Sequence, residues 1–475
     1  MSDFYLILVV ILGLLAIADL MVGVSNDAVN FLNSAIGSKV VSFKTLMVIA
    51  SLGVAFGAIS SSGMMEVARK GIFNPEMFVF SEIMIIFMAV MITDILLLDV
   101  FNSYGLPTST TVSIVFELLG AAVVISLIKL SALDLSLVEL SDYINTSKAT
   151  QIIFGIFFSV IVAFSIGALI QFISRIILSF KFEEKAKWMG SLFGGIALTS
   201  IFYFIVIKGL KGTPYSENQY DILGGLSISN FIDINLTMIV LLSLLILTIL
   251  SYLFNSVFKL NIYTLIICVG TFALALAFAG NDLVNFIGVP IAGYESFLAW
   301  SASGVSAESF TMEILSEKVS APTFILLGAG IIMVLTLWTS SKAKSVIKTS
   351  IDLSRQEETI ERFEPNFLSR FLVRAGSAFV ENFSKITPKP ILDFVDSQYI
   401  KPKINTLILR KDRPAFDKIR ASVNLVVAAI LISVATSYKL PLSTTYVTFM
   451  VAMGTSLADK AWGSESAVYL SLIHI

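Results

Sequence analysis

Residues 26–31, Asn-Asp-Ala-Val-Asn-Phe, recur as residues 281–286, Asn-Asp-Leu-Val-Asn-Phe. A second polar motif follows each copy, because residues 107–111, Pro-Thr-Ser-Thr-Thr, recur as residues 441–445, Pro-Leu-Ser-Thr-Thr. Chance rarely duplicates two motifs in the same order. We therefore infer an internal repeat, whose second copy is lengthened mainly by the charged segment 342–420.

The sequence around these motifs is strongly apolar. Of the 475 residues, 56% are hydrophobic and 14% are charged, whereas soluble domains average about 45–50% apolar and about 25% charged residues. The excess of apolar surface must face lipid, which excludes a soluble enzyme. The composition predicts an integral, multi-pass protein of the plasma (cytoplasmic) membrane.

Apolar runs long enough to cross about 30 Å of hydrocarbon recur along the chain. We predict an all-α polytopic fold with eleven spans, and the last residues, Leu472 to Ile475, could begin a twelfth span in a truncated C-terminus. The first run lacks the positive n-region and cleavage site of a signal peptide, so we interpret it as a retained helix. The runs are 4–24, 44–62, 77–100, 108–130, 150–178, 189–208, 235–255, 261–279, 322–341, 421–438 and 441–460.

Several chemistries are excluded by residue counts. The chain has one cysteine, Cys268, and one histidine, His474, so it has no intrachain disulfide, His-ligated metal site or Ser-His-Asp triad. The net charge of −2 provides no basic field for nucleic acid. We therefore expect no enzyme activity, no cofactor and no nucleic-acid partner.

The distribution of basic residues predicts the orientation. Residues 342–420 hold 16 of the 32 Lys and Arg residues, beside 10 acidic ones, and such segments stay in the cytoplasm. The N-terminus then lies outside. The loop 63–76 fits less well, because it falls outside although it contains Arg69 and Lys70; Glu66 and Glu76 balance them.

With this topology, corresponding spans in the two copies cross the membrane in opposite directions. Such an inverted repeat is typical of secondary transporters, whose halves expose a midplane site alternately. A structural membrane protein with an old duplication is the alternative. We divide the chain into a first repeat (1–130), connecting helices (131–260), a second repeat, first part (261–341), a charged cytoplasmic loop (342–420), the second repeat, last part (421–463), and an uncertain truncated tail (464–475).

The Ser/Thr motifs are typical of helix N-termini. Proline fits a first turn, and hydroxyls cap the free N–H groups there. Two such termini at membrane depth, each with the positive end of a helix dipole, could bind a tetrahedral oxyanion from opposite sides. Simple helix capping is the alternative for either motif alone.

The Asn-Asp motifs offer amide and carboxylate oxygens on neighbouring faces of a helix. This set suits a hard monovalent cation, and a cation beside an anion would offset the cost of dehydrating both. The alternative is a polar clamp between membrane helices, which asparagine readily forms.

Other intramembrane residues are more ambiguous. Glu117 lies about two turns after Thr110 and is a candidate pathway acid, whereas Asp94 and Asp99 suit either the pathway or a structural hydrogen bond. None has an acidic counterpart at the matching offset in the second copy, where Val451 stands opposite Glu117. Glycines such as Gly53, Gly57, Gly194 and Gly195 are typical of close packing or hinges.

With these motifs, the sequence resembles the inorganic phosphate transporter (PiT) family of sodium- or proton-coupled carriers. The duplicated Asn-Asp motif and its Pro-Ser/Thr companion carry the resemblance over residues 1–130 and 261–463. The resemblance implies a secondary active transporter that moves inorganic phosphate by symport with sodium or protons, commonly as a homodimer in the lipid bilayer.

The resemblance also implies roles for the motif residues. A histidine common after the Ser/Thr motif is replaced by Val112 and Tyr446, and Ser25 stands where alanine is usual. Sodium or a proton would occupy the Asn-Asp residues as the co-transported ion. The implied phosphate-binding residues are Ser109, Thr110, Thr111, Ser443, Thr444 and Thr445, and the implied coupling-ion residues are Asn26, Asp27, Asn30, Asn281, Asp282 and Asn285.

Three alternatives remain open at this point. A carrier of sulfate or another oxyanion would share the geometry. A membrane enzyme acting on a phosphorylated lipid, with Asp27 or Asp282 as general base, would need an asymmetric site with a headgroup pocket. A passive anion channel would conduct without any ion requirement.

Overall fold

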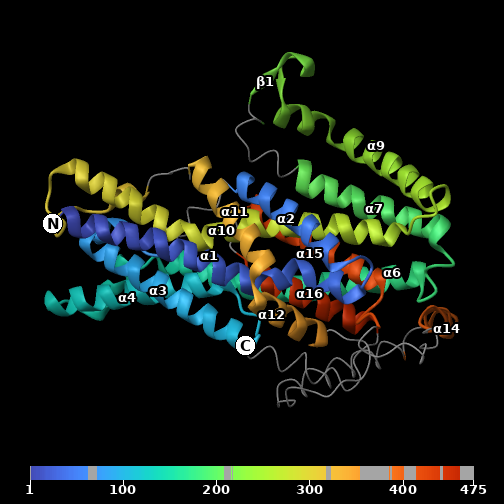
Figure 1. The fold of residues 1–475 in the computed structure, drawn as a ribbon, viewed down its shortest axis with the longest axis horizontal. Coiled ribbons are helices and arrows are strands. Elements are labelled where there is room, and N and C mark those ends of the chain that lie inside the picture. The colour runs from blue at the N-terminus through green and yellow to red at the C-terminus, as the bar shows by residue number, and fades with distance from the viewer. Residues whose placement is uncertain are drawn as a thin grey trace.

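The chain is an assembly of long helices, and a short hairpin supplies its only strands within the described residues (Figure 1). The computed structural model describes residues 2–61, 72–207, 216, 218–316, 322–353, 385, 388–400, 413–438 and 442–459. The hairpin pairs β1 (Gln219–Tyr220) with β2 (Leu226–Ser227) in antiparallel fashion. The predicted all-α polytopic class is confirmed. The main helices are α1 (Ser2–Ser38), α2 (Phe43–Ser60), α3 (Phe80–Tyr104), α4 (Thr110–Ala132), α6 (Thr146–Leu178), α7 (Ser191–Ile201), α9 (Ile228–Ser256), α10 (Ile262–Ser303), α11 (Thr323–Thr339), α12 (Ser341–Leu353), α15 (Lys418–Ser437) and α16 (Thr444–Ala458).

Several shorter elements connect these helices. Residues 186–205, which pass through α7, form one apolar helical stretch. The short elements are η2 (Pro75–Met77), η3 (Leu137–Glu139), α5 (Leu140–Tyr143), η4 (Ala186–Gly190), η5 (Phe202–Ile207), η7 (Asp221–Leu223), η8 (Glu313–Ser316) and α14 (Lys389–Gln398).

Most of the predicted spans coincide with helices. Among the described residues, nine helices are long and apolar enough to cross a membrane, and α11 with α12, bent by 69°, forms a tenth candidate. The eleventh predicted span contains α16, which has 15 residues. The exact number of spans stays a prediction, as do the segment boundaries, and the tail 464–475 lies outside the described residues.

Two helices continue well past their predicted ends. The predicted spans 4–24 and 261–279 stop before the Asn-Asp motifs, but α1 has 37 residues and α10 has 42. At 1.5 Å per residue these helices are about 55 and about 63 Å long. Each polar motif therefore lies inside a continuous helix, because polar side chains lower local hydropathy without interrupting the backbone hydrogen bonds.

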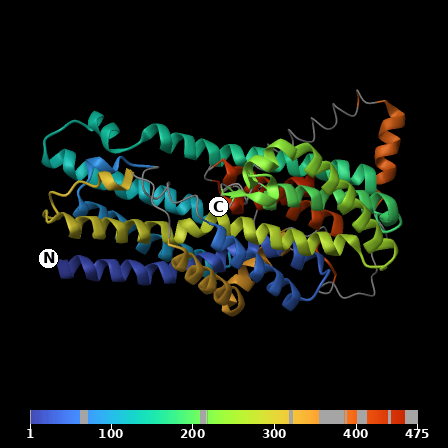
Figure 2. The same cartoon turned by 90° about the horizontal axis from the view of Figure 1, so that it is seen from above.

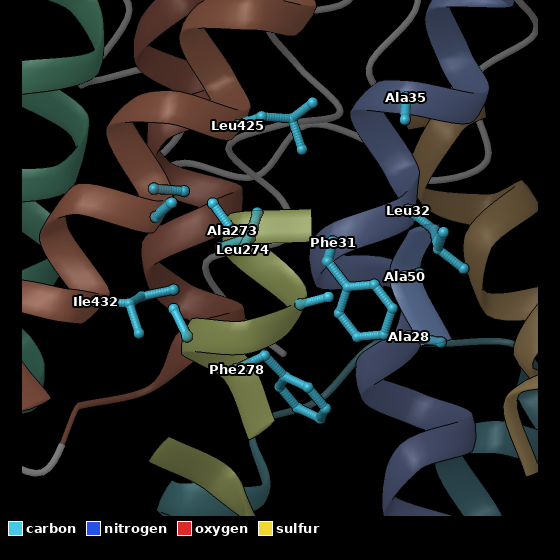
Figure 3. Packing of buried hydrophobic residues seen from close by; sticks show 14 of the residues in the cluster. Ala28, Phe31, Leu32, Ala35, Ala50, Ala273, Leu274, Phe278, Leu425 and Ile432 are labelled. Carbon is cyan, nitrogen blue, oxygen red and sulfur yellow. The ribbon is translucent and has the colours of Figure 1, made fainter. Parts of the chain in front are cut away.

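Helices α1 and α10 cross in opposite directions (Figures 1 and 2). The rings of Phe31 and Phe278 lie 5.2 Å apart, and Gly23 packs so closely on Phe286 that an added Cβ would lie 2.1 Å from its ring. Residue numbers therefore fall along α10 as they rise along α1. Figure 3 shows this packing between Phe31, on α1, and Phe278, on α10. The crossing brings the two Asn-Asp motifs together.

The buried apolar residues form two clusters that meet at this level. The first joins the second half of α1 to α2, α11, α15 and the start of α10. The second joins the first half of α1 to α3, α4 and the end of α10. The segment predicted as a charged loop (342–420) is partly structured, since α12 inserts Val346 and Ala343 into the first cluster. Amphipathic spacing gives this basic helix an apolar side.

Buried ion pairs connect one end of α6 to the start of α15 and the end of α16. The Arg175 guanidinium, on α6, contacts both carboxylate oxygens of Asp459, after α16, through Nε at 2.7 Å and Nη2 at 2.8 Å. Its Nη2 also lies 2.5 Å from Oδ2 of Asp417, the N-cap of α15. Arg175 and Asp459 are fully buried. Such paired charges stabilise only as a set, because removal of one partner leaves the other unpaired.

Glycines allow the backbones of α2 and α10 to touch. A Cβ at Gly53 would lie 2.5 Å from the carbonyl oxygen of Phe272, and one at Gly57 would lie 2.4 Å from that of Leu276. Small residues promote such packing in membranes, where the hydrophobic effect contributes little. The predicted close-packing role of these glycines agrees with the structure, and Gly195 likewise packs on Thr248.

Replacing Gly57 by valine should loosen this interface. Overpacking of this kind costs about 1–3 kcal/mol, so we expect a lower melting temperature in detergent than for the unchanged protein. Gly155→Val, on α6, is the matched control, because a Cβ there meets nothing within 4 Å. Equal melting temperatures for the two variants would contradict the packing role of Gly57.

Candidate functional site

Both Ser/Thr motifs begin helices, as predicted. Ser109 is the N-cap of α4 and accepts a hydrogen bond from the N–H of Val112 at 3.1 Å. Ser443 is the N-cap of α16 and accepts one from the N–H of Tyr446 at 3.0 Å. Pro107 lies ahead of the cap, so its expected place in the first turn is wrong, and Pro441 lies outside the described residues. The serine hydroxyls are therefore occupied in capping.

The threonines that open these helices bind the carboxylate of Asp27. Thr110 donates to Oδ2 at 2.9 Å, and Thr445 donates to Oδ1 at 3.1 Å. The amide of Asn30 adds a third donor to Oδ1 at 3.2 Å. Asp27 is fully buried, so these donors replace the water it would otherwise need.

Asp282 has the equivalent set of donors. Thr444 donates to its Oδ2 at 2.5 Å and Thr111 to its Oδ1 at 3.1 Å. The amides of Asn281 and Asn285 also donate to Oδ1, at 3.0 and 3.1 Å. Each aspartate is thus bound by one threonine of its own repeat copy and one of the other copy. All four motifs form a single site.

Asn30 and Asn285 also occupy equivalent places. The amide of Asn30 donates to Thr445 at 3.0 Å, and that of Asn285 donates to Thr111 at 3.1 Å. The side chains of the twelve predicted motif residues are buried, apart from that of Asn285, which is half-buried. The amide of Asn30 also donates to Thr444 at 3.4 Å, so the hydrogen bonds of Asp27 and Asp282 form one connected network.

Asn26 serves mainly as a clamp. Its Nδ2 donates to Asn102 Oδ1 at 2.8 Å and to the carbonyl of Leu106 at 3.1 Å, and its Oδ1 accepts the N–H of Thr108 at 2.8 Å. Asn26 therefore fixes the segment that leads into α4, which favours the polar-clamp interpretation for this residue. Asn281 is partly engaged in the same way, since its Oδ1 accepts a hydrogen bond from Thr436 at 3.3 Å.

A polar cavity adjoins the site on the side of α1 toward Ser38. Sequence reasoning predicted Asn30 but missed the other polar residues of its lining, because isolated polar residues in apolar runs carry no motif. Asn424 donates to Ser34 at 3.2 Å, and Thr448 donates to Asn30 at 3.3 Å. The lining residues are Val29, Asn30, Asn33, Ser34, Leu274, Asn424, Thr448, Phe449 and Ala452.

The remaining predicted acids separate into two environments. Asp99 forms a half-exposed ion pair with Lys342 at 2.6 Å, which favours its structural interpretation. Glu117 accepts a hydrogen bond from Ser113 at 2.7 Å, and Ser113 also contacts Asp94. Glu117 therefore belongs to a second acidic cluster and makes no hydrogen bond within the Asp27 and Asp282 site.

The site carries two carboxylates without a basic partner. Among the described residues, no Lys or Arg forms an ion pair with Asp27 or Asp282. Two unit charges 4 Å apart repel by about 4 kcal/mol at an effective dielectric constant of about 20. A bound cation would remove this repulsion, and carboxylate, hydroxyl and amide oxygens are the ligands that hard cations prefer.

Comparisons with known proteins identify the family and the fold. A protein of Thermococcus kodakarensis described as a "putative phosphate permease" is 26% identical over 320 residues, which cover 65% of this chain and 68% of that protein. The fold is similar to a solved structure described as "The sodium-dependent phosphate transporter", with a TM-score of 0.59, 17% identity, and coverage of 98% of this chain and 99% of that one. The sequence model of the phosphate transporter family matches residues 23–350, which include both Asn-Asp motifs. This integral, multi-pass membrane protein therefore belongs to the phosphate transporter family.

Proposed function

We propose that the protein is a secondary active transporter that moves inorganic phosphate by symport with sodium. The crossed Thr–Asp hydrogen bonds carry the proposal, because they join both repeat copies at one buried site. The family match supports phosphate as the cargo. Protons are the alternative coupling ion, since carboxylates can bind either.

The N-termini of α4 and α16 supply the phosphate-binding groups in this proposal. Positive helix ends with free N–H groups favour oxyanions, and the hydroxyls of Thr110, Thr111, Thr444 and Thr445 add donors. A threonine hydroxyl has a single hydrogen to donate. That hydrogen goes to Asp27 or Asp282, so a threonine in this position does not donate to phosphate.

Cation binding would release these hydrogens. A sodium ion coordinated by the Asp27 and Asp282 carboxylates would cancel one of their two negative charges and take up their oxygens, so the threonines can turn toward a phosphate oxygen. Phosphate alone would meet two carboxylates of its own sign, and repulsion of about 4 kcal/mol per close pair opposes this. The obligation to bind cation and anion together is the physical basis of symport.

The opposed directions of α1 and α10 support alternating access. In an inverted-repeat carrier, the two copies rock around a midplane site. Asp27 and Asp282 lie between two contacts of α1 with α10, that of Phe31 with Phe278 and that of Gly23 with Phe286. The polar cavity beside Asn30 extends the site toward the side we assign to the cytoplasm. Its volume of about 10 Å³ holds about one water, so release of phosphate on this side would require the cavity to widen.

We also propose a homodimer, as the resemblance implies. Helix α9 buries Ile232 and Ser251 and leaves most of its other apolar residues exposed, so lipid or a second copy can cover it. A sulfate carrier would use the same site with a different selectivity. The enzyme alternative is disfavoured by the equivalence of the two aspartates, which gives neither one the separate role of a general base.

The deciding experiment is radiolabelled phosphate uptake into proteoliposomes. Three conditions are compared: an inward sodium gradient, an inward proton gradient, and no gradient, each with sulfate or arsenate as competitor. Accumulation driven by sodium supports the proposal. Equal uptake in all three conditions would indicate a passive channel, and inhibition by sulfate alone would indicate another oxyanion.

Asp27→Asn and Asp282→Asn should each lower sodium-driven uptake at least about tenfold, because one charge is lost while the size of the side chain is kept. Uptake against sodium concentration measures the effect. Asp99→Asn is the matched control, since the half-exposed Asp99–Lys342 pair contributes little. Unchanged sodium dependence in both variants would remove the carboxylates from coupling.

The double variant Thr110→Val/Thr444→Val should weaken phosphate binding at least about tenfold, because hydrogen bonds to charged groups contribute about 1.5–3 kcal/mol each. Phosphate affinity is measured by competition in sodium-loaded protein. Thr271→Val is the control, because Thr271 is buried on α10 but bonds only the carbonyl of Ile267. Wild-type affinity in the double variant would exclude the hydroxyls from phosphate binding.

A further inference from the structure

A second acidic cluster lies apart from the Asp27 and Asp282 site. Asp19 of α1 and Asp94 of α3 are fully buried, and Glu117 of α4 is half-buried beside them. Within the described part of the chain, no Lys or Arg forms an ion pair with any of the three. Three unpaired carboxylates in such a place would each lose several kcal/mol of hydration.

The contacts of Ser113 with two carboxyl groups point to a proton in this cluster. Its hydroxyl lies within hydrogen-bonding distance of Asp94 Oδ1 and, at 2.7 Å, of Glu117 Oε1. A hydroxyl donates one hydrogen, so it can donate to only one of these two oxygens. The other contact is a hydrogen bond only when that carboxyl is itself protonated and donates to Ser113.

Asp19 gives an independent indication of a missing proton. Both of its carboxylate oxygens are buried and have no hydrogen-bond donor, and the same is true of Asp94 Oδ2 and Glu117 Oε2. Asp19 lies on α1, which packs directly against α3, the helix that carries Asp94. Two carboxylates can share a hydrogen bond only if one of them carries a proton.

We propose that Asp19, Asp94 and Glu117 form a proton-binding site, which Ser113 connects internally and which is separate from the phosphate site. Binding forms one O–H bond at a carboxylate oxygen and breaks none in the protein. The bound proton removes one negative charge, supplies the missing donor, and can pass between Asp94 and Glu117 through the Ser113 hydroxyl.

The surrounding charges leave this cluster without another source of neutralisation. The groups that face Asp19 are Asp94, Glu117 and, farther away, Asp27. Two basic groups on the neighbouring helices form ion pairs elsewhere, and the acidic groups of α10 add negative charge. These groups are Lys342 of α12, paired with Asp99 of α3; Lys129 of α4, paired with Glu82 of α3; and Asp282 and Glu295 of α10.

The cluster is close enough to the proposed coupling-ion site for its proton to change the affinity of that site for a cation. Asp19 lies eight residues before Asp27, a distance of about 12 Å along the helix. At an effective dielectric constant of about 20, a change of one charge at that distance alters cation affinity roughly tenfold. Protonation should therefore weaken sodium binding at Asp27; this consequence, unlike the proton site itself, rests on the proposed function.

Infrared spectroscopy of the purified full-length protein tests the proton site directly. We expect a carbonyl band of a buried carboxylic acid near neutral pH, which shifts in D₂O and loses intensity in Glu117→Gln and in Asp94→Asn. Asp99→Asn is the control and should leave the band unchanged. A wild-type spectrum without such a band, or a band of equal intensity in all the variants, would overturn the proposal.

Two further measurements separate this proposal from simple loss of folding or of transport. Ser113→Ala keeps all three carboxyls but removes their link, and it should shift the frequency of the band without abolishing it; an unchanged frequency would contradict the relay. Sodium binding measured from neutral to alkaline pH should strengthen about tenfold in the wild type, as the cluster loses its proton, and less in Glu117→Gln. If phosphate uptake fails altogether, the infrared result still decides the proton site.

Discussion

Two carboxylates at the crossing of α1 and α10 must be stabilised without a basic partner among the described residues. Asp27 and Asp282 are fully buried, and four threonine hydroxyls from two helix N-termini supply their hydrogen bonds. Those hydroxyls can reach both aspartates only if the two copies of the repeat interlock. The burial of two charges therefore explains the long continuous helices, their antiparallel crossing and the placement of α4 and α16.

The same constraint connects structure to transport. A site with surplus negative charge has affinity for cations, and a site built on helix N-termini has affinity for oxyanions. Neither ligand is well accommodated alone, because each leaves a charge or a donor unsatisfied. The second acidic cluster around Asp94 extends this logic to a proton.

Much of this arrangement could be predicted from the sequence, because repeated motifs carry strong information. The helix starts at Ser109 and Ser443, and the convergence of the two Asn-Asp motifs, follow from local chemistry and repetition. The full length of α1 and the clamp role of Asn26 could not be predicted, since both depend on partners such as Asn102 that are distant in sequence. Asp19 escaped notice for the same reason, because its neighbours Asp94 and Glu117 come from other helices.

Close backbone contact makes α6 and α16 a single mechanical unit. A Cβ at Gly454 would lie 2.1 Å from the carbonyl oxygen of Phe164, and Arg175 holds Asp459 at the end of α16. Neither helix can slide past the other without breaking these contacts. Helix α6 exposes aromatic rings such as Phe157 on its outer side, and α16 begins at the site. The pair therefore connects the outer surface of the protein to the site. A displacement of α6 would therefore also move the hydroxyls of Thr444 and Thr445, which hold Asp282 and Asp27.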